Sequence, residues 1–180
     1  METLTAEQVI LVDDQDQPLG TMEKMAAHQQ GLLHRAFSVF VFNSRGEMLL
    51  QRRALSKYHS GGLWTNTCCS HPRPGEAVAD AALRRLQEEM GFTTPLQKVF
   101  DFVYRASFHN GLVEHEFDHV FVGAYEGVMQ LNPEEVMEAA YWPVDEIGRR
   151  LKASPDEFTE WFALAFPGIE AWWQKNYASV

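Results

Sequence analysis

Residues 64–72 hold the side chains of this chain that are best suited to carry out chemistry. Both cysteines lie here as the adjacent pair Cys68 and Cys69, and His71 follows two positions after Cys69. A thiol close to an imidazole can transfer protons, attack as a nucleophile or bind a metal ion. A cysteine near a tryptophan is, however, more often a small buried hydrophobic residue, and we expect this of Cys68. Other parts of the chain must therefore supply the partners of an active site.

Two further candidates, Glu114 and Glu116, alternate along a strand predicted over residues 112–125. Side chains on a strand alternate between its faces, so these glutamates share one face with Asp118. Acids in this pattern commonly face water on a half-buried strand, but on a strand that lines a cleft they can hold a cation. The pattern alone does not choose between these two interpretations.

A helix is predicted over residues 76–90, with its apolar residues at helical spacing and Gly91 as its C-terminal stop. At about 100° per residue, Arg85 and Glu89 share one flank of the apolar stripe. Glu89 is therefore placed to reach a cleft over the sheet, whereas Glu88 points away from it. The alternative for Arg85 and Glu89 is a surface ion pair that contributes about 0.3–0.5 kcal/mol.

Basic residues gather near the cysteine stretch, although the chain has a net charge of −10. These residues are Lys24, Arg52, Arg53 and Lys57. A local basic cluster in an acidic chain favours a small anionic ligand, and the forked donors of arginine suit phosphate. A solvated strand end is an equally reasonable interpretation. The acidic balance as a whole argues against nucleic-acid binding.

Length and composition predict one globular domain over residues 1–180, because 46% of the residues are hydrophobic and 12% are aromatic. We find no signal peptide and no apolar run long enough to cross a membrane. Adjacent cysteines rarely form a disulfide, which suits a reducing compartment. We therefore expect a cytoplasmic protein.

The remaining patterns predict a mixture of strands and helices. Strands are predicted over 8–13, 34–42, 47–52, 99–108 and 140–142, with a short returning strand or turn over 19–24; the runs 34–42 and 47–52 form a β-hairpin. Helices are predicted over 25–30, 144–152 and 156–177, the last interrupted at Pro167 and Gly168, with a loop over 133–138. Strict βα alternation is missing, so we expect an α/β (α+β) domain, an α/β/α sandwich around a mixed sheet.

Several motifs together resemble type I isopentenyl-diphosphate isomerase, a family of the Nudix superfamily. The motifs are Thr65-Asn66-x-x-Cys69-x-His71-Pro72, the basic run over 52–57, Tyr104-Arg105-Ala106 and Glu114-x-Glu116. Their order and spacing agree with the family over nearly the whole chain, which makes the combined match specific. The resemblance implies a Nudix-like fold.

The predicted helix is similar to the Nudix box but departs from it. Glu76 and the run Glu88-Glu89-x-Gly91 fit the box, Ser70 stands at its first glycine, and Arg85 stands where nucleotide hydrolases of the superfamily have a metal-binding glutamate. The isomerases show the same kind of loss. The departure therefore favours an isomerase over a hydrolase.

The resemblance also implies two metal sites. One divalent ion (Mn²⁺, Mg²⁺ or Zn²⁺) would be bound by His28, His34, His71, Glu114 and Glu116. A Mg²⁺ bridging to the substrate diphosphate would be bound by Glu89 and the backbone carbonyl of Cys69. The other histidines, His59, His109, His115 and His119, we interpret as surface or core residues.

For catalysis, the family implies an acid/base pair of Cys69 and Glu116, with Tyr104 beside the glutamate. The diphosphate would be bound by Lys24, Arg53, Lys57, Ser70 and Arg85, and Trp161 would line the hydrocarbon pocket. The reaction would interconvert isopentenyl and dimethylallyl diphosphate, in isoprenoid biosynthesis, through a tertiary carbocation. We expect a monomer with a small-molecule diphosphate as its substrate.

Two other functions remain open. A Nudix diphosphohydrolase would cleave the ligand, and the glutamates Glu88 and Glu89 favour it while Arg85 opposes it. A non-catalytic module that binds metal or diphosphate would keep the basic cluster without requiring Cys69.

Overall fold

The computed structural model describes residues 7–177 of the 180-residue chain, so the ends of the predicted domain, residues 1–6 and 178–180, lie outside it. The strands are β1 (Gln8–Val12), β2 (Pro18–Glu23), β3 (His34–Phe42), β4 (Met48–Arg53), β5 (Trp64–Thr65), β6 (Cys68–Ser70), β7 (Gln97–Ser107), β8 (Val113–Ala124) and β9 (Val136–Trp142). The helices are α1 (Lys24–Gln30), α2 (Val78–Met90), α3 (Val144–Ala153), a 3₁₀ turn η1 (Pro155–Glu157) and α4 (Glu160–Asn176).

The central strand of the sheet is β3, which pairs with four neighbours. It runs parallel to β8 over its whole length, with His34 opposite Glu116 and Phe42 opposite Ala124. Its pairings with β1, β4 and β6 are antiparallel. The predicted mixed sheet and the β3–β4 hairpin are therefore confirmed.

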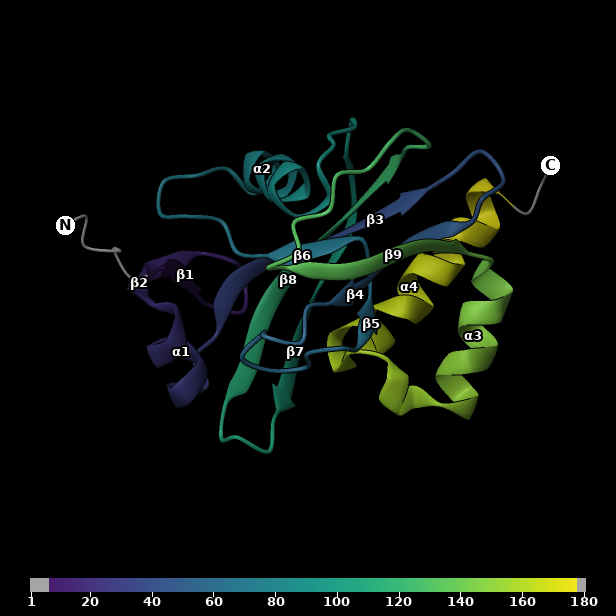
Figure 1. The fold of residues 1–180 in the computed structure, drawn as a ribbon. Helices are drawn as coiled ribbons and strands as arrows, with labels where there is room; N and C mark the ends of the chain where they lie inside the picture. The colour runs from purple at the N-terminus through teal and green to yellow at the C-terminus, as the bar shows by residue number, and fades with distance from the viewer. Residues whose placement is uncertain (1–6, 178–180) are drawn as a thin grey trace.

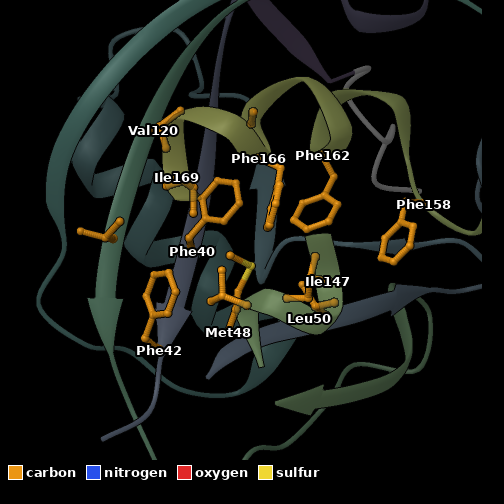
Figure 2. Close-up of a cluster of buried hydrophobic side chains, with 13 residues drawn as sticks. Phe40, Phe42, Met48, Leu50, Val120, Ile147, Phe158, Phe162, Phe166 and Ile169 are labelled. Atoms are coloured by element: carbon orange, nitrogen blue, oxygen red, sulfur yellow. The ribbon is translucent and has the colours of Figure 1, made fainter. Parts of the chain in front are cut away.

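Alternation along β3 produces the layers of the fold. Phe37, Val39 and Val41 pack with the buried residues of α2 on one face of the sheet. Phe40 and Phe42 pack against residues of α3 and α4 on the other face (Figure 2). Figure 1 shows α2 on one side of the strands, with α3 and α4 on the other. The α/β/α sandwich that we expected is confirmed.

Helix α2 begins two residues later than the sequence predicted, at Val78. Glu76 lies before it, where its carboxylate accepts hydrogen bonds from the backbone N–H of Arg73 and from the side chain of Arg84. This carboxylate therefore closes the loop before α2 instead of belonging to its first turn.

The predicted interruption of the last helix at Pro167 is wrong, because α4 continues through it. Pro167 and Gly168 lie on the exposed side, while Phe166 and Ile169 on the opposite side are buried in the core. Packing of that apolar face outweighs the lost backbone hydrogen bond. The residues before α4 form a separate 3₁₀ turn, η1.

The predicted loop over 133–138 is also partly wrong, since β9 begins within it at Val136. Val136 lies opposite Arg53 of β4, and the pairing continues to Trp142 opposite Met48. Pairing with β4, which is distant in the chain, therefore makes this segment extended. The sequence of the segment by itself does not predict a strand.

Candidate active site

Two buried histidines are oriented by backbone carbonyl groups. The Nδ1 atom of His28 lies 2.7 Å from the carbonyl oxygen of Lys24, one turn back in α1. The Nδ1 atom of His34, the first residue of β3, lies 2.8 Å from the carbonyl oxygen of Leu32. Since a carbonyl only accepts, each Nδ1 carries the proton, and Nε2 of the neutral ring has a free lone pair. Both Nε2 atoms are buried and have no hydrogen-bond partner, which is the state of a metal-binding histidine.

His71 and Glu116 complete this polar cluster. Oε1 of Glu116 lies 2.8 Å from Nε2 of His71 and 3.5 Å from Nε2 of His34. One ligand atom from each of His28, His34, His71 and Glu116 lies within 4.8 Å of the others. Three imidazoles around one carboxylate, contributed by α1, β3, β8 and the segment after β6, form a set of N and O ligands that suits Mn²⁺, Mg²⁺ or Zn²⁺.

Burial determines the charges in this cluster. It lowers the pKa of His28 to about 4 and also lowers the pKa of His71, so both rings are neutral near pH 7. Burial opposes ionisation of Glu116 as well, but His71 and His34 outweigh this and hold its pKa well below the usual range. For His34 the contact with Glu116 outweighs burial and raises the pKa. An ionised Glu116 beside the neutral rings of His28 and His71 is a protonation state that suits a divalent cation.

Glu114 lies beside this cluster and has its own partners. Its Oε1 is 2.9 Å from Nε2 of His59, and with His28 these residues form a second group of possible ligands. The hydroxyl of Tyr104 lies 2.9 Å from Oε2 of Glu114 and 2.7 Å from Oε2 of Glu116. Burial raises the pKa of Tyr104 well above its ordinary value, so its one proton is available to either carboxylate. Tyr104 therefore fixes the two glutamates relative to each other.

The two adjacent cysteines point to opposite faces of the sheet. Cys68 is fully buried in the core beneath α2, as expected from its sequence context. Cys69 packs against Tyr104 and Trp161 and lines a narrow cavity of about 50 Å³, which Glu116 also lines. Burial raises the pKa of Cys69 well above its ordinary value, so its sulfur keeps its proton at neutral pH. The structure thus brings Cys69, Glu116, Tyr104 and Trp161 together around one cavity.

A wider cavity of about 360 Å³ adjoins the narrow one and is mostly basic. Its lining residues are Lys24, Lys57, Arg73, Arg84, Arg85, Tyr58, Glu7 and Glu135. The guanidinium of Arg53 and the side chain of Ser70 line the narrow cavity instead, where Arg53 lies 5.1 Å from the centre of the Trp161 ring. All five residues predicted to bind a diphosphate therefore lie in these two connected spaces. Arg52, in contrast, turns away and donates to the carbonyl of Gly62 at 2.8 Å.

The predicted flank of the Nudix helix is confirmed, since Glu89 is buried and lines the narrow cavity. Its Oε1 accepts from Arg85 at 2.7 Å, and its Oε2 accepts from Gln51 at 2.8 Å. Arg85 also lies 2.7 Å from Glu88 and 3.2 Å from Glu135. The ion pair that we weighed as an alternative is present, and it orients Glu89 toward the cavity.

Comparisons with known proteins identify the family. Residues 32–162 match the NUDIX domain family. The chain is 53% identical to "Isopentenyl-diphosphate Delta-isomerase" of Pectobacterium atrosepticum, over 93% of each chain. It is 55% identical to "Isopentenyl-diphosphate Delta-isomerase 2" of Aromatoleum aromaticum, over 91% of this chain and 86% of that protein. The chain belongs to the Nudix-fold isopentenyl-diphosphate Delta-isomerase family.

A solved structure supports the fold of this family member independently. The crystal structure of DR0079 from Deinococcus radiodurans superposes with a TM-score of 0.70, covering 82% of this chain and 90% of that one. The two sequences are 19% identical, so the likeness shows the Nudix fold alone.

Within residues 7–177, none of the helices has the length and apolar character to cross a membrane.

Sequence reasoning missed two residues at the site of this isomerase-family chain. His59, which we interpreted as a surface or core histidine, is buried against Glu114. Glu135 stands between Lys57 and Arg85 and forms ion pairs with both. The sequence feature that could have pointed to His59 is its position two residues after Lys57, which was predicted to bind the diphosphate. Glu135 lies in the predicted loop over 133–138, and its position depends on the pairing of β9 with β4. His115 and His119 have structural partners, Gly31 and Asp16.

Proposed function

We propose that this chain interconverts isopentenyl and dimethylallyl diphosphate, the activity that gives its relatives their name. The observation that carries the proposal is the placement of Cys69 and Glu116 around one narrow cavity. Both residues are proton-transfer groups, and the isomerisation consists of adding one proton and removing another. The wider basic cavity beside it suits the diphosphate end of the same substrate.

The narrow cavity would hold the hydrocarbon part of the substrate. Protonating the terminal carbon of the double bond gives a tertiary carbocation, and loss of a proton from the neighbouring CH₂ group gives the product. Protonation of an unactivated alkene requires an acid held against the double bond away from water. The half-buried thiol of Cys69 and the carboxylate of Glu116 would serve as the acid/base pair on the two sides of the flat alkene.

Tyr104 and Trp161 would complete the hydrocarbon end. Through its hydroxyl, Tyr104 is hydrogen-bonded to Glu116 and can hold that carboxylate in place. The face of the Trp161 ring can stabilise the cationic intermediate by about 2 kcal/mol when water is excluded. Arg53 already lies over this ring, which supports the view that the ring accepts a cation.

The diphosphate would lie among Lys24, Arg53, Lys57, Ser70 and Arg85. The carboxylates of Glu7, Glu135 and Glu89 form ion pairs with three of these cations. A diphosphate would compete for these cations, with a bidentate contact to the guanidinium of Arg85 and single charges from Lys24 and Lys57. Glu89, together with the backbone carbonyl of Cys69, would hold a Mg²⁺, which would supply positive charge for binding the diphosphate.

The second divalent ion would be held by His28, His34, His71 and Glu116, with Glu114 beside them. The free Nε2 atoms of His28 and His34 support this assignment, because they are buried and unpaired. When bound, the ion would supply a fixed positive charge that sets the acidity and orientation of Glu116. We expect Mn²⁺, Mg²⁺ or Zn²⁺ here, and we expect the protein to act as a cytoplasmic monomer.

A Nudix diphosphohydrolase is the second candidate, favoured by the retained Glu88 and Glu89. Against it stands Arg85, whose guanidinium occupies the place of a hydrolase carboxylate and pairs with both of these glutamates. A third possibility, a non-catalytic binding module, would leave the position of Cys69 in the cavity without a purpose.

A single assay separates these three functions. The protein would be incubated with isopentenyl diphosphate and Mg²⁺ in deuterated water, and the products analysed by NMR and phosphate release. We expect dimethylallyl diphosphate that carries deuterium. Released phosphate without isomerised product would support the hydrolase, and unchanged substrate that binds the protein would support the binding module.

A further inference from the structure

The loop between β4 and β5 places Lys57 and His59, two positions apart in the chain, on different parts of the site. Lys57 pairs with Glu135 at the basic cavity, and His59 lies next to Glu114 at the other end. The loop is held at its base by two backbone hydrogen bonds of 2.9 Å, between Arg53 and Leu63 and between Gly62 and Arg53. Its tip is held by Asn110, which donates to the carbonyl of Tyr58 at 3.2 Å. His59 therefore sits on an anchored loop.

Aromatic packing fixes the orientation of the His59 ring. The ring stacks on Phe108 with 4.4 Å between centroids and 10° between planes. It meets the Trp161 ring edge-on, with 5.7 Å between the ring centroids. Only 6% of His59 is exposed. Such a ring cannot turn freely, so the direction of its Nε2 atom is a property of the fold.

The contact between His59 and Glu114 is close but is not a hydrogen bond. Nε2 of His59 lies 2.9 Å from Oε1 of Glu114, yet this buried nitrogen has no hydrogen-bond partner because the direction of the ring N–H does not fit. Two donor atoms side by side at this distance match neighbouring ligands of one cation, since bonds of about 2.0–2.2 Å place adjacent ligands roughly 3 Å apart. The pair thus has the spacing of two neighbouring ligands of one cation.

His28 supplies the third donor of this group. One ligand atom of His28 lies within 4.8 Å of those of His59 and Glu114, and the Nε2 atom of His28 is buried and unpaired as well. The other ring nitrogen of His28 is used by the carbonyl of Lys24. His28 can therefore bind only one ion at a time. Because both groups share His28, the group with His59 would belong to the same one-ion centre as His34, His71 and Glu116.

We propose that His59 is an additional ligand of the metal centre, binding the ion together with His28 and Glu114. This inference rests on the proposed metal centre and adds to it a residue from the loop that also carries Lys57. Occupation of the metal centre would then fix the same loop that contacts the diphosphate. Binding of the metal ion and binding of the diphosphate would therefore be coupled.

NMR of the histidine rings tests the proposal directly. Full-length protein with ¹⁵N-labelled histidines would be freed of metal with a chelator and titrated with Zn²⁺ alone. The ring signals of His59 would be assigned by their loss in His59→Phe. We expect the Nε2 signals of His28, His34, His59 and His71 to move to metal-bound positions, while those of His109, His115 and His119 stay.

The outcomes of this titration test the inference about His59 separately from the proposed metal centre. If the signals of His28, His34 and His71 move and that of His59 stays, the inference about His59 is wrong and the metal centre stands. If none of the histidine signals moves, the proposed metal centre is wrong as well.

Zn²⁺ affinity gives a second, independent measurement. His59→Phe keeps an aromatic ring against Phe108 and Trp161 but removes the nitrogen. We expect it to bind Zn²⁺ at least about tenfold more weakly in competition with a chelator, as for changes near metal ligands. The control is His109→Phe, at an exposed turn. Equal affinity of both variants and the unaltered protein, with equal melting temperatures of the metal-free forms, would overturn the proposal.

Discussion

The two ends of β3 are both buried and chemically opposite. At one end Phe42 of β3 is fully buried in the core between the sheet and the helices α3 and α4. At the other end His34 lies opposite Glu116, and both are buried as well. The same two strands in one continuous register therefore carry a hydrophobic core and a polar site.

The difference shows where stability and function are located. Burial of apolar surface stabilises the Phe42 end, at about 25 cal/mol per Å² of area removed from water. Burial of charge at the His34 end costs free energy unless the groups are paired or bind an ion. The apolar burial around Phe42 therefore offsets the cost of burying charge around His34. Substitutions at the two ends should have separable effects on stability and on activity.

The largest effect that we expect on activity comes from the cavity thiol. Cys69→Ala removes a proton-transfer group and should lower the rate of isomerisation about 10²–10⁴-fold, the range for general acid–base catalysis. Substrate binding should be retained, since Lys24, Arg53 and Arg85 are unchanged. The rate would be measured by NMR with isopentenyl diphosphate, and binding by calorimetry.

The neighbouring cysteine is the matched control for this comparison. Cys68→Ala removes a thiol that is buried beneath α2 on the opposite face. We expect a loss of about 1 kcal/mol in the free energy of unfolding, typical of a single substitution, with normal turnover. Near-normal turnover of Cys69→Ala would contradict the role that we assign to this residue.

At the core end, Phe42→Ala should show the reverse pattern. Removing a fully buried ring should lower the free energy of unfolding by about 3–5 kcal/mol. Turnover per folded molecule should stay the same, because Phe42 lies at the other end of β3 from His34. Urea unfolding gives the stability, and assays well below the unfolding midpoint give the turnover. A fully folded variant that is inactive would show that the two ends are not separable.

Removal of metal should destabilise the site end selectively. Buried ligands without their ion are unsatisfied, so a chelator should lower the melting temperature. Mn²⁺ or Zn²⁺ at a hundred times its Kd should restore about 2.7 kcal/mol of stability. Calorimetric melting of the chelated and reloaded protein provides the measurement. His71→Ala is the control and should respond much less to added metal. The same response from both proteins would argue against a centre that includes His71.

The smallest effect should come from the hydroxyl shared by the two glutamates. Tyr104→Phe keeps the ring in the cavity wall but frees Glu114 and Glu116 to move. We expect metal affinity or turnover to fall about 10–100-fold, as for other residues that orient ligands. Tyr125→Phe removes a hydroxyl bonded to the carbonyl of Val128, away from the site, and serves as the control. Identical behaviour of the two variants would remove Tyr104 from the mechanism.

The amino-acid sequence by itself determined the elements that have a local pattern. The bounds of β3, its hairpin with β4 and the flank of α2 that carries Glu89 could be predicted, because alternation and helical spacing involve residues close together in the chain. The ordered motifs around Cys69, Tyr104 and Glu116 indicated the family for a similar reason. Each motif is a short string that can be recognised without coordinates.

Only the tertiary structure decided how the site is shared among its residues. Glu114 lies with His59, whereas Glu116 lies with His34 and His71, and Glu135 enters the basic cavity through the pairing of β9 with β4. Pro167 remains in a helix because that helix packs on the sheet. These outcomes depend on contacts between segments far apart in the chain. The free energy of such contacts comes from burial and pairing in the folded molecule, which no local pattern records.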